Sequence, residues 1–300
     1  MGEARPTTFA WGKSQSGEYH RLVNHCADVA ACFEALAALA TVRDRMERSA
    51  CLILSEIAIA RLAVLAFLHD AGKLHPGFQA KGWPLGAWIG PLHGHVAEGA
   101  FLFSRSGVVN LSRRLLIEDL NRWNVDPGLL AAVFAHHGRP VSPDRHASSG
   151  WDPIDPYDPQ VAAAELGEMA RLWFPAAFAP DQATLPSTPE FQHFFCGLVS
   201  LADWLGSDRR VFEFVAALDR DYIAKARDRA RKAAYDVGLD VHGLRREVEG
   251  RATFATLTGR DRPRPAQASA AEFSLDERLV ILEAETGSGK TEAALCRAID

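Results

Sequence analysis

The sequence predicts an all-α fold for most of its 300 residues, followed by a short segment of a different kind. First, apolar residues recur at intervals of three and four in successive segments, which is the spacing of helices with one buried face. Second, histidines and aspartates fall on these apolar faces or at the ends of the segments. Third, a strand-like run and a glycine-rich loop follow near residue 290, which indicates a separate element at the C-terminus.

The composition is that of an ordinary globular protein, with 48% hydrophobic and 24% charged residues, and the length suits one large domain or two. A net charge of −5 excludes a chain that is basic throughout, but it leaves room for a local basic channel and a nucleic-acid partner. The cysteines form no CxxC pair, so disulfides and a thiolate zinc site are not expected. They are Cys26, Cys32, Cys51, Cys196 and Cys296.

Nothing in the sequence indicates a membrane protein. No run approaches the roughly 20 apolar residues of a membrane-spanning helix. Residues 1–17 lack the apolar core of a signal peptide. We therefore expect a soluble, cytoplasmic protein with no membrane partner.

The first predicted helix carries a histidine on its buried face. Residues 11–17 are expected to be irregular, and the helix that follows places His25, Val29, Phe33 and Leu36 on one side. Taken alone, His25 is best explained as a histidine of the core. A ligand role depends on whether matching residues occur elsewhere in the chain.

A second predicted helix, over residues 52–71, brings His69 and Asp70 to its C-terminal end, where Gly72 is expected to stop it. A neutral imidazole beside a carboxylate suits divalent transition metals. The Gly- and Pro-rich segment 74–91 is predicted to form an ordered loop over this site. Its aromatic residues are expected to pack within the loop, with base stacking as an alternative.

Further histidines and an aspartate fall at the ends or within three later helices. Either His93 or His95 could be a ligand, and His95 is the better candidate because a helical pattern follows it directly. The helix over residues 127–137 ends in His136 and His137 before a glycine, which repeats the arrangement at residues 69–72. Asp203 lies among apolar neighbours in a helix that starts near residue 189, so its carboxylate needs a cation.

The ordered series His, His-Asp, His, His-His, Asp resembles the two-metal members of the HD phosphohydrolase superfamily, which are all-helical bundles. Lys73, three residues after Asp70, and the sequence from Ser200 to Asp208 are similar to the HD nuclease of CRISPR-associated nuclease-helicases from type I interference systems. The resemblance covers the chain from about Trp11 onward.

This resemblance implies a set of metal ligands and a catalytic pair. One divalent ion would be held by His25, His69, Asp70 and Asp203, and Asp70 would bridge to a second ion. The ligands of the second ion would be His95, His136 and His137. Asp70 and Lys73 would be the catalytic residues, with Lys73 neutralising the scissile phosphate. Histidine-rich ligation favours Mn, Fe, Co or Ni over Mg.

The last segment has the pattern of a phosphate-binding loop. Residues 280–283 are predicted to form a buried strand, and the loop 284–291 is expected to open a helix at Glu292. The first position is Ala284 rather than glycine, a departure that superfamily-2 helicases share. Gln267 is similar to the adenine-recognising glutamine of their Q motif. The expected nucleotide contacts in the loop are Thr286, Gly287, Ser288, Gly289, Lys290 and Thr291.

Residues 1–250 are therefore predicted to be an HD nuclease domain, and residues 251–300 the first strand and loop of a truncated RecA-like helicase lobe. The resemblance implies cleavage of single-stranded DNA, recruitment by a guide-RNA surveillance complex of the Cascade type, and ATP with Mg for the full-length helicase. Two alternatives stay open, which are an HD phosphohydrolase acting on nucleotides and an inactive module that docks the helicase. The physiological metal, internal versus terminal cleavage and the role of His75 also stay open.

Overall fold

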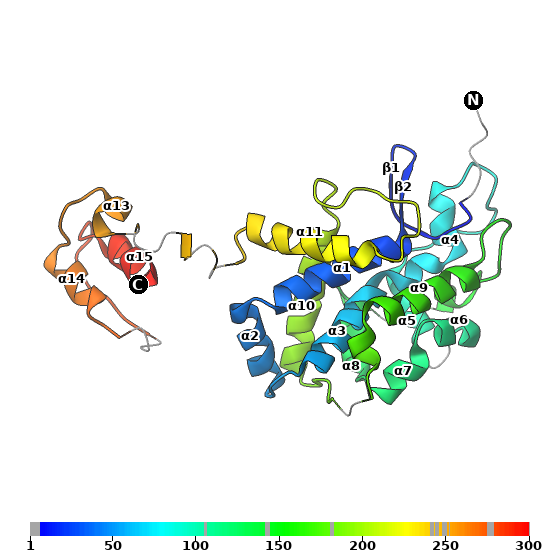
Figure 1. The fold of residues 1–300 in the computed structure, drawn as a ribbon, viewed down its shortest axis with the longest axis horizontal. Coiled ribbons are helices and arrows are strands. Elements are labelled where there is room, and N and C mark those ends of the chain that lie inside the picture. The colour runs from blue at the N-terminus through cyan, green and yellow to red at the C-terminus, as the bar shows by residue number, and fades with distance from the viewer. Residues whose placement is uncertain are drawn as a thin grey trace. The chain divides into compact units, whose positions relative to one another are not determined.

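The computed structural model describes residues 7–104, 107–141, 145–180, 183–240, 243, 246–247, 251, 253–274 and 279–299. The chain folds into two compact units, Met1–Leu239 and Asp240–Asp300, and the division lies upstream of the expected boundary at residue 250. The first unit is a helical bundle, as Figure 1 shows, so the predicted all-α fold is confirmed.

Helix α1 (Leu22–Ala37) forms the centre of the first unit, and 14 of its 16 residues are buried. A helix that is apolar on nearly all sides is stable only when other elements surround it. Helices α3 (Glu56–Phe67), α10 (Pro189–Gly206) and α11 (Tyr222–Asp236) pack against α1 (Figure 1). Asn24, His25 and Asp28 on α1 are therefore placed inside the bundle.

Further helices complete the bundle and carry the chain around these four. Several helices of the unit begin with a capping side chain, such as Ser55 before α3 and Thr188 before α10, which each accept a hydrogen bond from a backbone N–H of the first turn. The remaining α-helices of this unit are α2 (Ala40–Ala50), α4 (Pro76–Gln79), α5 (Val96–Leu102), α6 (Val109–Arg114), α7 (Ile117–Arg122), α8 (Pro127–Phe134) and α9 (Pro159–Trp173). Short 3-10 turns are η1 (Leu68–Leu74), η2 (Ala80–Gly82), η3 (Arg145–Ser148) and η4 (Pro175–Phe178).

The N-terminal segment that was expected to be irregular is a β-hairpin, with strands β1 (Trp11–Gln15) and β2 (Glu18–Arg21). Ser16 and Gly17 form its turn, with φ angles of 53° and 84°. When both residues of a two-residue turn have positive φ angles, the turn matches the right-handed twist of the two flanking strands. The Ser-Gly pair is a sequence signal for a hairpin turn, and the prediction of an irregular segment did not use it.

The predicted helix over residues 52–71 is shorter than expected. Helix α3 ends at Phe67, and the chain continues as the 3-10 turn η1 with a kink at Asp70. Gly72 does not stop the helix with a left-handed conformation, because its φ lies outside that region. A Cβ atom there would lie 1.8 Å from the carbonyl oxygen of His95, so the glycine permits the start of α5 to pack on η1.

The second unit contains α13 (Phe254–Thr258), α14 (Pro265–Ala271) and α15 (Lys290–Ile299). The strand expected over residues 280–283 is not formed, and α15 begins two residues before Glu292. A buried strand needs a neighbour for its backbone N–H and C=O groups, and no strand occurs among the described residues of this unit. The prediction of a strand was therefore wrong for this chain as it folds here.

The described helices were also compared with the requirements of a membrane span. None of them is by itself long and apolar enough to cross a bilayer. The pair α1 and α2 reaches the required length and composition only together, across a bend of 89°. Helix α1 is the buried centre of the bundle, as described above.

Candidate metal centre

The structure brings together seven side chains from five separate segments of the first unit. They come from α1, η1, the residue before α5, the turn after α8, and α10. All seven were singled out from the sequence. They are His25, His69, Asp70, His95, His136, His137 and Asp203.

One group of three, His25, His69 and Asp203, has its ligand atoms within 4.8 Å of one another. The Nε2 atoms of His25 and His69 lie 3.5 and 3.7 Å from Oδ1 of Asp203. Asp70 adjoins this group, since its Oδ2 lies 3.1 Å from Nε2 of His25 and 3.3 Å from Nε2 of His69. Two imidazoles and two carboxylates thus face one small volume.

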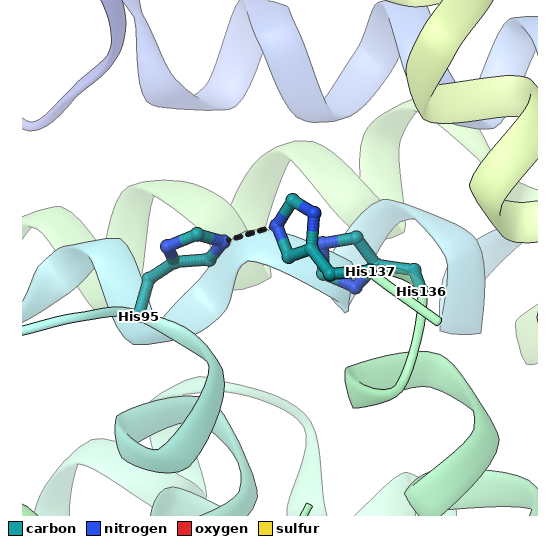
Figure 2. Close-up of side chains that lie close together, drawn as sticks. All are labelled: His95, His136 and His137. Carbon is teal, nitrogen blue, oxygen red and sulfur yellow. Dashed lines mark hydrogen bonds between the residues drawn. The ribbon is translucent and has the colours of Figure 1, made fainter. Parts of the chain in front are cut away.

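A second group consists of His95, His136 and His137, whose ligand atoms also lie within 4.8 Å of one another. Figure 2 shows the ring of His95 pointing towards the other two, with its Nε2 3.0 Å from Nε2 of His137. Oδ1 of Asp70 lies 3.2 Å from Nε2 of His95 and 3.9 Å from Nε2 of His136. Asp70 therefore directs one oxygen to each group.

Two of the histidines are oriented by the helix ends on which they lie. Nδ1–H of His69 donates to the carbonyl of Ala66 at 2.9 Å, and Nδ1–H of His136 donates to that of Val133 at 2.8 Å. Both carbonyls are three residues earlier, in the last turn of a helix, where carbonyl groups accept hydrogen bonds from side chains. Because Nδ1 carries the proton, Nε2 is the atom available as a metal ligand.

Several buried polar atoms of the centre lack a hydrogen bond. Among the residues that the structure describes, Nε2 of His25, His69 and His136 and Oδ1 of Asp70 have no hydrogen-bond partner. Leaving such atoms unpaired in the interior is costly. A divalent cation would satisfy them together, so the residues present fit a metal site.

The electrostatics of the centre keep three of its histidines and both of its aspartates in the protonation states that bind metals. Burial lowers the pKa of His25 and of His136 to about 4 and that of His95 to about 3, so these rings are neutral at pH 7. Burial acts to raise the pKa of Asp70, but Lys73 and His69 hold it well below its usual range. Against the same effect of burial, the neighbouring rings of His25 and His69 lower the pKa of Asp203.

Lys73 lies beneath Asp70, away from solvent. Its Nζ is 2.5 Å from Oδ2 of Asp70 and donates to the carbonyl of Gly12 at 2.8 Å. The residue is 5% exposed, so its charge acts on Asp70 in this structure. Its expected contact with a scissile phosphate stays a prediction.

The structure places His95 in the centre and His93 outside it. Nδ1 of His93 lies 3.0 Å from Oε1 of Glu98, and its ring stacks on that of His75 at 3.9 Å. Nδ1 of His75 accepts from the N–H of Gly77 at 2.9 Å, which caps α4, and Nε2–H donates to the carbonyl of Ser149 at 2.8 Å. His75 is thus a structural histidine of the loop.

The roles of two residues in the centre were missed from the sequence. Ser200 on α10 donates to the carbonyl of His136 at 2.5 Å and so fixes the turn that carries the second group. Lys13 on β1 approaches Asp203, with Nζ 3.7 Å from Oδ1. Neither contact has a sequence signature, because one involves a backbone carbonyl and the other depends on the hairpin.

In the second unit, the expected nucleotide-binding residues also lie together. Gly287 and Gly289 have φ angles of 79° and 91° within the loop, and Nζ of Lys290 donates to the carbonyls of Ala284 and Glu285 at 2.6 and 2.9 Å. Gln267 donates to the carbonyl of Gly289 at 2.9 Å. Thr286, Ser288 and Thr291 belong to the same loop and helix start.

A helical bundle with a His-Asp pair at the centre of a histidine-rich cluster defines the HD-domain class of proteins. Within that class the chain belongs to the family described as "Cas3, HD domain", which matches residues 11–212. The resemblance to the HD domain of CRISPR-associated nuclease-helicases is confirmed.

Known relatives agree with this membership. The chain is 31% identical to the "CRISPR-associated endonuclease/helicase Cas3" of Thermus thermophilus over 95% of its length, and 27% identical to the protein of that name from Escherichia coli over 96%. The chain spans about a third of the length of these two relatives, 31% and 36% respectively. A crystal structure of the Thermus thermophilus Cas3 HD domain in the presence of Ni2+ matches with a TM-score of 0.52 and 25% identity. The match covers 77% of this chain and 90% of that one.

Proposed function

We propose that the first unit is a metal-dependent nuclease that cleaves single-stranded DNA by two-metal phosphodiester hydrolysis. The observation that carries this proposal is the position of Asp70, whose two oxygens face two separate ligand groups. A carboxylate shared by two groups of ligands suits a pair of divalent ions. The family membership supports the same activity.

The residues divide between the two ions. His25, His69 and Asp203 would hold the first, His95, His136 and His137 would hold the second, and Asp70 would contact both. When bound, the two ions would supply an activated water and stabilise the attacking and leaving oxygens of an in-line displacement. Lys73, through its ion pair, keeps Asp70 ionised for this task.

The donor set favours transition metals over Mg. Imidazole nitrogens form most of each group, and they suit Mn, Fe, Co or Ni, whereas Mg prefers carboxylates and water. The related HD domain from Thermus thermophilus was crystallised with Ni2+. We propose a pair of such ions as the cofactor.

The biological setting rests on the relatives, whose names describe CRISPR-associated endonuclease/helicases. We infer that the substrate is a DNA strand exposed by a guide-RNA surveillance complex of the Cascade type. We also infer that the second unit, with Lys290 and Gln267 at its loop, belongs to an ATP- and Mg-dependent helicase that feeds the strand to the nuclease.

The test is cleavage of circular single-stranded DNA by the 300-residue chain with Mn2+, Co2+ or Ni2+ and without ATP. Circular DNA has no ends, so a product shows internal cleavage. Asp70→Asn should abolish cleavage because it removes the negative charge that the two metal-ligand groups share. Asp44→Asn is the matched control, since Asp44 is an exposed residue of α2 that pairs with Arg48.

The wild type and the Asp44→Asn variant should cut the circle equally. Intact circles from a metal-loaded wild type, together with hydrolysis of mononucleotides, would instead favour the nucleotide phosphohydrolase. Intact circles with no hydrolysis of mononucleotides or of a linear single strand would favour a docking module.

A further inference from the structure

Lys13 is a partly exposed cation in contact with the candidate metal centre. Its Nζ lies 3.7 Å from Oδ1 of Asp203, and its side chain is 30% exposed. The side chain of Lys73, by contrast, is 6% exposed and its charge is directed to Asp70. The two lysines thus differ in their access to a ligand that approaches from solvent.

The hairpin holds Lys13 at this position through its neighbours. Trp11 and Gln79 exchange two hydrogen bonds, from Trp11 N–H to Oε1 at 2.9 Å and from Nε2 to the Trp11 carbonyl at 3.0 Å. Gly12 lies against α1, where a Cβ atom would be 2.9 Å from Cβ of His25. Its carbonyl accepts from Lys73. The backbone on the N-terminal side of Lys13 is therefore fixed, while its side chain reaches the edge of the centre.

The charges of the centre leave Lys13 without a fitting partner once metals are bound. Asp203 is the carboxylate of the first ligand group, and a divalent ion held by it would repel a neighbouring ammonium. A negatively charged group arriving from solvent would relieve that repulsion. Phosphate oxygens of a DNA strand are such groups, and lysine binds them as a point charge.

We propose that Lys13 binds a backbone phosphate of the single-stranded DNA substrate at the first ligand group, moving from Asp203 to the phosphate when metal and DNA are bound. This inference rests on the proposed nuclease function and adds a substrate-binding residue that contacts DNA rather than metal. The five cations of α11 are less suited to this role, because each pairs with a carboxylate. The pairs are Lys225–Asp219, Arg227–Glu34, Arg229–Glu213, Arg231–Asp228 and Lys232–Asp236.

The test compares Lys13→Gln with the wild type in steady-state cleavage of a single-stranded oligonucleotide by the metal-loaded chain. Loss of one phosphate contact should raise KM about tenfold and change kcat little. The slope of log affinity against log salt should become shallower by about 0.7, the value of one contact on a single strand. Lys13→Arg keeps the charge and should retain the slope.

Lys232→Gln is the matched control, because it removes the same charge from an exposed residue of α11 and should leave KM and slope unchanged. Metal content of each variant is measured in parallel and should equal that of the wild type. A Lys13→Gln variant that cleaves with wild-type KM and slope, or one that loses its metal, overturns the inference. A wild type that does not cleave would overturn the proposed function itself.

Discussion

At the scale of single residues, His69 is the histidine whose protonation differs from that of its neighbours. Burial acts to lower its pKa, but the nearby carboxylates of Asp70 and Asp203 raise it to about 9. Without metal, His69 is therefore protonated at pH 7. A metal ion must displace that proton, because only the neutral ring is a ligand.

We expect metal binding to become tighter as the pH rises. Between pH 6.5 and 8.5, below the pKa of His69, the apparent affinity of the first ion should increase about tenfold per pH unit. His25 and His136, with pKa values of about 4, add nothing in this range. Calorimetry in two buffers of different ionisation enthalpy should show release of about one proton when the first ion binds. An affinity independent of pH would contradict this account of His69.

The seven ligand candidates could be proposed from the sequence because their order and spacing form a pattern. His25 illustrates why the pattern was needed, since a single buried histidine on a helix has a structural explanation. Lys13 and Ser200 could not be found in this way. Their roles come from contacts across the fold, to a carboxylate and to a backbone carbonyl.

At the scale of elements, α10 supports both ligand groups. It carries Asp203, and Ser200 and Cys196, one turn apart, contact the carbonyls of His136 and Ala135 in the turn after α8. Partners that orient ligands commonly change metal affinity when they are removed. We therefore expect the contacts of Ser200 and Cys196 to affect the affinity for the second ion.

Ser200→Ala should weaken binding of the second ion about tenfold, while the affinity for the first ion stays unchanged. The free energy of unfolding without metal should fall by about 1 kcal/mol, the typical worth of one hydrogen bond. Metal titration and urea unfolding measure the two effects. Ser49→Ala is the control, since its hydroxyl donates to the carbonyl of Met46 on α2. Equal weakening of the binding of both ions would contradict the inference that Ser200 orients the turn that carries His136 and His137.

Gly72→Ala should disturb the contact between η1 and α5. The added Cβ would meet the His95 carbonyl oxygen at 1.8 Å and the Gly99 nitrogen at 2.5 Å, and both are backbone atoms that cannot rotate away. The free energy of unfolding should fall by about 1–3 kcal/mol or more.

Gly197→Ala on α10 is the matched control for Gly72→Ala, because a Cβ atom there meets nothing within 4 Å. It should stabilise the helix by about 0.5–1 kcal/mol. Urea unfolding of the two variants beside the wild type measures both effects. A Gly72→Ala variant as stable as the wild type would contradict the packing role of this glycine.

Two wrong sequence predictions, a helix stop at Gly72 and a strand over residues 280–283, share a physical cause. Gly72 and Gly138 both follow ligand pairs, yet only Gly138 has a positive φ, of 77°. Local sequence cannot distinguish a glycine that ends a helix from one that permits close packing. The expected strand at residues 280–283 likewise depends on neighbouring strands, which local sequence does not reveal.

At the scale of the whole molecule, the metal centre is confined to one unit. All seven candidate ligands and the residues that orient them lie within Met1–Leu239. Leu239 packs against the core of this unit, which makes it a suitable end point. The helical bundle was predictable from helical spacing, whereas the position of the division depends on tertiary contacts.

A chain ending at Leu239 should fold cooperatively and bind metal as the 300-residue chain does. Circular dichroism during urea unfolding and metal titration would measure this, with the full chain as the control. Loss of metal binding in a folded shortened chain would show that the second unit contributes to the centre.

The central claim is a paired metal site organised around Asp70, and counting the bound ions tests it most directly. After dialysis against Mn2+ or Ni2+, elemental analysis of the wild type should give two ions per chain. His137→Ala should leave one, and Asp70→Asn should lower the occupancy of both groups. One ion in the wild type, or two ions in all three proteins, would contradict the account.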